Sequence, residues 1–169
     1  MFKEAPMHAM IANIPLVVFL IAAVLSILAL FVKKGTFNLI LFIVTAIGTL
    51  GMYGSIVTGQ AALEAYHVPA GAATKLLEQH QHLASTVMII ALVATGFTFI
   101  QLILAYIKPT KVYKIVSLVS LVLLIVTSVL TLQIVKKGTQ LVYKYGVGVE
   151  KDEGTSSTPE TMIDDHKSS

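Results

Sequence analysis

The chain has 169 residues, of which 56% are hydrophobic and 12% are charged, and it contains no cysteine. An average soluble domain carries about 25% charged residues, so this composition excludes a soluble globular core. The lack of cysteine excludes disulfides, thiolate metal sites and thiol catalysis. All 12 basic residues are lysine, which removes the guanidinium fork that binds phosphates, so nucleic acid is not an expected partner.

The first long apolar run predicts a helix over about residues 10–32, which ends at Lys33-Lys34-Gly35. Its opening stretch, "APMHAMIANIPL", places His8 and Asn13 at the mouth of the helix. The run is longer than the apolar region of a signal peptide, and lysines follow it instead of a cleavage site, so we expect a retained helix. Pro15 is expected in its first turn, where a missing N–H does no harm.

The second helix is predicted over about residues 37–60, after a turn short enough to make the two helices antiparallel neighbours. Gly48, Gly51 and Gly54 are expected to be positions of close helix packing. The next connection, "AALEAYHVPAGAATKLLEQHQH" over residues 61–82, is polar enough to leave the membrane and has helix-forming pieces on both sides of Pro69 and Gly71.

The third helix has its apolar part at residues 83–107, and the fourth is predicted at about residues 112–135. "TQLVYKYGVGV" after Gly138 reads as an amphipathic extension near the membrane interface. Residues 150–169 are rich in polar side chains and are expected to be disordered. The predicted fold is an all-α integral membrane four-helix bundle, antiparallel and up-down-up-down, formed by residues 1–149 and surrounded by the lipid bilayer.

The orientation follows from the lysines in short loops. Lys33, Lys34, Lys108, Lys111 and Lys114 flank the first and third connections, and no acidic residue stands among them. We therefore expect these loops in the cytoplasm, and both termini and the second connection outside the cytoplasmic (inner) membrane. Two further lysines, at positions 136 and 137, weaken this asymmetry.

Four histidines fall at the end opposite these lysine loops: His8, His67, His80 and His82. At about 1.5 Å per residue, His8 lies roughly 37 Å from Lys33 and His82 roughly 39 Å from Lys108, which makes the two level. Polar residues at similar depth are expected to face the bundle interior, whereas the other half of the bundle reads as aliphatic apart from Gln101. These polar residues are Asn13, Thr58, Gln60, Ser85, Thr86, Thr131 and Gln133.

Three chemistries fit histidines from two helices. One is bis-imidazole ligation of haem b by His8 with His80 or His82, only one of which can face the ligand because they lie about 200° apart on a helix. The second is copper held by "MHAM", with thioethers from Met7 and Met10. The third is a proton relay through Glu78, His80 and His82. The alternative is that the histidines are interfacial anchors without a ligand.

Three stretches resemble the predicted bacterial membrane proteins catalogued as domain of unknown function 2231: "MHAMIANIPL", "EQHQHLAS" and "GTQLVYKYGVGV". The resemblance covers about residues 7–149. It implies a four-helix integral membrane protein, often suspected of binding haem, in which His8 and His80 match the histidines of helices one and three. Asn13 stands where the family commonly has a second histidine, and Ala9 where it commonly has proline.

Together these features lead us to expect a small b-type cytochrome-like membrane protein that transfers electrons to or from another membrane or outer-face redox protein. The haem iron would be held near the outer face by His8 and His80, with His82, His67 and Asn13 around it; copper is the weaker cofactor. The alternative is a cofactor-free accessory or structural subunit of a membrane protein complex. No nucleophile and base are brought together by spacing, so the sequence does not indicate an enzyme.

Overall fold

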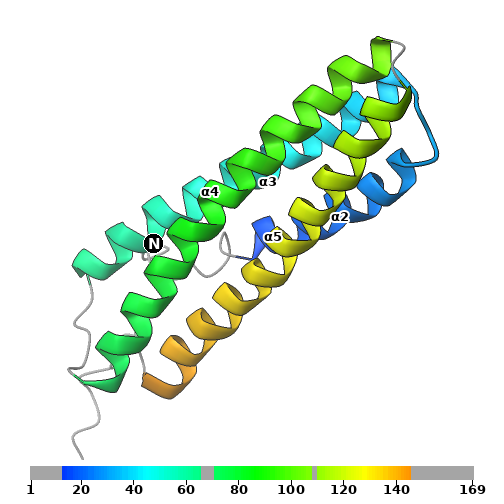
Figure 1. Cartoon of the computed structure of the whole chain (residues 1–169). Coiled ribbons are helices and arrows are strands. Elements are labelled where there is room, and N and C mark those ends of the chain that lie inside the picture. Colours follow the sequence, from blue (N-terminus) through cyan, green and yellow to red (C-terminus); the bar gives the residue numbers. More distant parts are fainter. Residues whose placement is uncertain (1–12, 66–70, 108–109, 146–169) are drawn as a thin grey trace, which may run out of the picture.

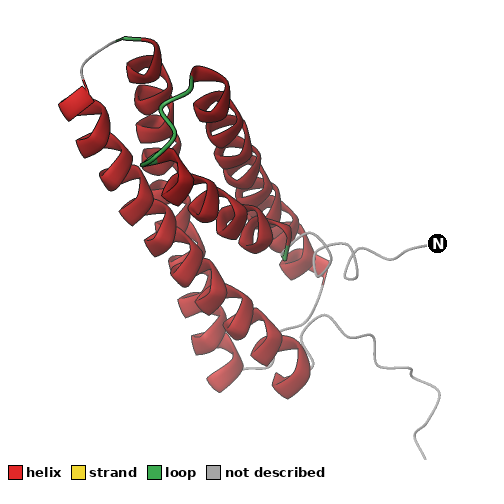
Figure 2. Ribbon diagram, turned by 90° about the vertical axis from the view of Figure 1, so that its right-hand side faces the viewer, coloured by secondary structure: helices red, strands yellow, loops and turns green. Residues whose placement is uncertain are grey.

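The computed structural model describes residues 13–65, 71–107 and 110–145, which form four α-helices and no strand (Figure 1). The helices are α2 Ile14–Ala29, α3 Gly35–Ala65, α4 Ala72–Tyr106 and α5 Thr110–Tyr145. Each packs against its neighbours in the chain, and α2 also packs against α5, which closes the bundle (Figure 2). The predicted all-α four-helix bundle is confirmed. Successive helices alternate in direction in Figure 1, which agrees with the predicted antiparallel order.

Helix α2 starts directly after Asn13, with Pro15 buried in its first turn, as predicted. It has 16 residues in the described part of the chain and ends where the N–H of Leu30 bonds to the carbonyl of Ile27 at 3.2 Å. After a short turn, Asn38 supports the start of α3, because its Nδ2 donates to the carbonyl of Lys34 at 2.9 Å.

The other three helices are longer than predicted. Helix α3 continues to Ala65 and α4 begins at Ala72, so helix occupies most of the predicted connection over residues 61–82. The extension predicted after Gly138 is a continuation of α5 over residues 139–145, and its position at the membrane interface stays a prediction. A helical glycine costs only about 1 kcal/mol, and the buried Leu141 extends the packed face of α5. The predicted domain boundary at residue 149 and the tail lie outside the described residues.

Within the described residues, three helices are long and apolar enough to cross a membrane: Gly35–Ala61, Ala72–Tyr106 and Lys111–Tyr145. Helix α2 is apolar but shorter than the roughly 20 residues that a span needs. Large aliphatic side chains lie exposed on the outer faces, among them Val24 at 58%, Leu50 at 68% and Ile89 at 64%. Such a surface suits hydrocarbon, and the chain is a multi-pass membrane protein.

Lysines flank the bundle at both ends. Lys33, Lys34, Lys111 and Lys114 lie at the end that we call the lysine-loop end, where α2 finishes and α5 begins. Lys75, Lys136, Lys137 and Lys144 lie toward the opposite end, which carries His80 and His82 and which we call the histidine end. With equal numbers of described lysines at the two ends, the predicted orientation of the termini stays a prediction.

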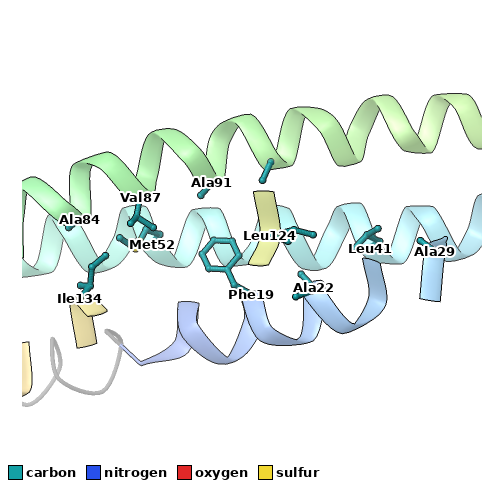
Figure 3. Packing of buried hydrophobic residues seen from close by; sticks show 12 residues of the cluster. Phe19, Ala22, Ala29, Leu41, Met52, Ala84, Val87, Ala91, Leu124 and Ile134 are labelled. Atoms are coloured by element: carbon teal, nitrogen blue, oxygen red, sulfur yellow. The ribbon is translucent and has the colours of Figure 1, made fainter. Parts of the chain in front are cut away.

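Most buried positions of α4 and α5 repeat alternately at steps of three and four residues, as in coiled-coil packing. On α4 they are Ala84, Val87, Ala91, Ala94, Thr98 and Gln101. On α5 they are Tyr113, Ser117, Ser120, Leu124, Thr127, Thr131 and Ile134. These rows, which we call the seams, face the interior of the bundle, around a core in which Phe19 and Leu124 are central (Figure 3). Many of the residues are small, which lets membrane helices approach closely.

Two of the three predicted glycine packing positions are confirmed. A Cβ placed on Gly48 would lie 2.9 Å from the ring of Phe19, and one on Gly51 would lie 3.5 Å from Pro15. The prediction is wrong for Gly54, where a Cβ meets nothing within 4 Å.

Candidate functional site

His80 continues the seam of α4, because it stands four residues before Ala84. Gly138 stands four residues after Ile134 and continues the seam of α5 in the same way. The two residues meet: a Cβ on Gly138 would lie 3.3 Å from Cε1 of His80. The imidazole is half-buried with its Nδ1 atom enclosed, so the missing side chain at Gly138 makes room for the ring.

His82 lies on another face of α4 and is exposed. It lines an open groove of about 410 Å³ between α4 and α5, together with Glu78, Gln79, Leu83, Gln133 and Lys137. Across this groove Lys137 Nζ donates to Gln79 Oε1 at 2.8 Å. His80 and His82 therefore point in different directions, as the sequence predicts, and only His80 takes a seam position.

The remaining predicted ligands are not brought together by the described residues. His8, Met7, Met10 and His67 lie outside them, so ligation by His8, whether of haem or of copper, stays a prediction. Asn13 is described and is exposed at the start of α2. Within the described ranges there is no group of three or more histidine, cysteine, aspartate or glutamate side chains that could hold a metal ion.

The expectation that polar side chains of the histidine end face the interior is largely wrong. Thr131 is buried and bonds to the carbonyl of Thr127 at 2.7 Å. The others are half-buried or exposed: Asn13, Thr58, Gln60, Ser85, Thr86 and Gln133. Whether a helical residue faces inward depends on its rotational position as well as on its depth: Ser85 and Gln133 stand next to seam residues and are exposed.

The expectation that the lysine-loop half of the bundle is aliphatic inside is also wrong. Asn38, Gln101 and Tyr113 are buried there, with exposed fractions of 0, 0 and 2%. Asn38 Oδ1 accepts from Gln101 Nε2 at 2.9 Å and from the Tyr113 hydroxyl at 3.3 Å. The hydroxyl has a single proton, which it shares between Asn38 Oδ1 and the nearer acceptor, the carbonyl of Ala29 at 2.9 Å. These bonds join all four helices, and we call Asn38, Gln101 and Tyr113 the amide-tyrosine cluster.

Lys33 closes this end of the cluster. Its Nζ lies 5.5 Å from the centre of the Tyr113 ring and donates to the carbonyl of Ile107 at 3.4 Å. A lysine over an aromatic face is attracted by the ring quadrupole. The ammonium of Lys33 therefore packs on the side of the cluster that is nearer the lysine loops.

Sequence reasoning noticed Gln101 and passed over Asn38 and Tyr113. A signal was available, because Asn38 is an amide near the start of a long apolar run, and polar groups inside membrane segments usually face the bundle interior. The partner of Gln101 was not readable, since that depends on how α3 and α4 are rotated against each other.

The comparisons with known proteins agree with this architecture. A family model described as "Predicted membrane protein (DUF2231)" matches residues 4–151 of the chain. Searches of curated proteins and of solved structures found no match.

Proposed function

The chain belongs to the DUF2231 family of predicted membrane proteins, and on this premise we propose that its histidine end binds haem b and that it carries electrons within the membrane. That the chain is a multi-pass membrane protein with a helical bundle holds independently of this proposal. The proposal is specific to one end of the bundle and to one face of α4.

The position of His80 carries the proposal. An ionisable side chain on the inner face of a membrane helix is costly to keep there, and such residues commonly mark a functional site. His80 is the described histidine that continues a seam, and Gly138 makes room for its ring on the inner side of α5. An apolar bundle with an inward-facing imidazole is a common framework for holding a haem between helices.

Two imidazoles are needed to hold the haem iron in this way. His80 supplies one, and the second has to come from outside the described residues. His8 stands six residues before the first residue of α2, and His67 stands in the connection between α3 and α4. Of these we propose His8, as the partner from the chain segment that leads into α2. His82 is unsuited because it faces the outer groove, and the amide of Asn13 is a poor axial ligand for iron. Bound haem would supply one-electron transfer, and this chain would hold it and exclude water from it.

The purified protein, supplied with haem, is expected to show a Soret band and sharp α and β bands on reduction. Replacing His80 by alanine is expected to remove the sharp reduced bands, because one of the two histidines proposed to hold the iron is lost. His82→Ala is the matched control, since it removes an exposed histidine two positions away on the same helix. Its spectrum should match that of the parent protein. A featureless spectrum of the folded parent protein, or equal losses in the two variants, contradicts the proposal.

A second candidate, an accessory subunit of a membrane complex, is supported by Gly96. This residue is exposed on α4, and a Cβ there meets nothing within 4 Å. Glycines on the outside of a membrane helix suit close approach of another helix.

If a partner helix packs on Gly96, Gly96→Leu is expected to abolish co-purification of a membrane partner while leaving the bundle folded. Val93→Leu, an apolar exchange at an exposed position of the same helix, should leave co-purification unchanged. The two preparations would be compared by tagged pull-down from native membranes in mild detergent. Equal partner yields from the parent and Gly96→Leu contradict this second candidate.

A further inference from the structure

A second polar site lies inside the bundle beside the amide-tyrosine cluster, far from the histidines. We propose that Ser26, Gln101 and Ser117 bind an internal water molecule that bridges α2, α4 and α5. This site is independent of any cofactor at the histidine end, because it uses different residues at the opposite end of the helices.

The burial of three polar atoms is the first step. Ser26, Gln101 and Ser117 are each 0% exposed. The two serine Oγ atoms and Gln101 Oε1 have no hydrogen-bond partner among the described residues. A buried polar atom left unsatisfied costs about 1–3 kcal/mol, and most such atoms in folded proteins are paired with protein or with ordered water.

Other buried hydroxyls of the bundle behave differently. Thr45, Ser120 and Thr127 each donate to the carbonyl four residues earlier in their own helix, at 2.8, 2.9 and 2.8 Å. This back-bonding is the usual way in which a helix satisfies serine and threonine. Ser26 and Ser117 do not use it in this structure, so their hydroxyls are available to another partner.

The three residues lie on the inner faces of α2, α4 and α5. Ser26 stands one turn before Ala29 on α2, and Ser117 stands one turn after Tyr113 on α5. The hydroxyl of Tyr113 bonds to the carbonyl of Ala29, which fixes α2 against α5 at this level. Each serine therefore stands about one helical turn further from the lysine-loop end than the residue of its own helix that takes part in this bond. Gln101 is tied to the same level, because its amide and the Tyr113 hydroxyl share the Oδ1 atom of Asn38.

The hydrogen-bonding capacity of the three buried atoms favours water as their shared ligand. Gln101 Oε1 can only accept, whereas a serine hydroxyl can donate and accept, and water can satisfy both kinds of group. Exchanging the amide atoms of Gln101 would set oxygen against Asn38 Oδ1, so the oxygen is assigned to the unsatisfied side. A buried water typically makes about three hydrogen bonds, which matches the three atoms.

A double-mutant cycle tests the shared water. Ser26→Ala and Ser117→Ala are each expected to lower the thermal unfolding midpoint of the full chain in detergent by roughly 2–4 °C. The double variant is expected to fall by less than the sum, because either change already weakens the binding of the same water. Ser120→Ala is the control, since its hydroxyl bonds to its own helix; combined with Ser26→Ala, its effect should be additive.

Additive effects at Ser26 and Ser117, or midpoints that rise when these hydroxyls are removed, overturn the proposal, since they show dry hydroxyls that do not share a ligand. The water itself can be observed as NMR cross-peaks between water protons and the backbone N–H groups near Ser117 in bicelles. These cross-peaks are expected in the parent protein and lost in the double variant. Their absence from the folded parent protein also overturns the proposal, whatever the cycle gives.

Discussion

Asn38→Leu is expected to lower the free energy of unfolding in detergent by about 2–4 kcal/mol. Its Oδ1 accepts from Gln101 and Tyr113, and its Nδ2 donates to the carbonyl of Lys34. Leucine has a similar volume but makes none of these bonds, so Gln101 Nε2 loses its acceptor in the closed interior. The loss should appear as a lower denaturant midpoint with an unchanged slope, because the same surface is still exposed on unfolding.

The matched control for this prediction is Gln133→Leu, which exchanges an exposed amide for the same residue. A surface substitution of this kind usually changes stability by no more than about 0.5 kcal/mol. Similar small losses in both variants would show that Asn38 is not a structural centre of the bundle. A large loss confined to Asn38→Leu agrees with a polar cluster that ties the four helices together.

The helices were predictable from the sequence because apolar runs and lysine or proline breaks are strong signals for membrane segments. Their ends were not. The polar stretches beside the second connection contain good helix formers such as Ala61, Leu76, Glu78 and Gln79, so the chain leaves the apolar run without leaving the helix. The limits of an apolar run set where a helix meets hydrocarbon, and not where its hydrogen bonds stop.

The sequence predicted at which end of the bundle the candidate site lies, but not which side chains there face inward. Counting residues placed His80 and His82 at one end, yet it did not assign which of them faces inward. The alternating steps of three and four along α4, which run from Ala84 to Gln101, select His80 and were readable from the small residues of that helix. The bond between Tyr113 and Ala29 was not readable, because it depends on how α2 and α5 meet, 84 residues apart in the chain.

Gly48→Ala is expected to destabilise the bundle by about 1–3 kcal/mol, because a new methyl group must fit into a filled core. A Cβ at this position would lie 2.9 Å from Cε1 of Phe19 and 3.2 Å from Val18, and Phe19 is fully buried. The matched variant Gly54→Ala lies on the same helix, where a Cβ meets nothing within 4 Å. It should instead stabilise by about 0.5–1 kcal/mol, because alanine favours helix over glycine. Denaturant unfolding of both variants in one detergent measures whether each substitution lowers or raises the free energy of unfolding. If both variants gained stability, the ring of Phe19 would have room to move, and the close contact between α2 and α3 would not set the packing of this core.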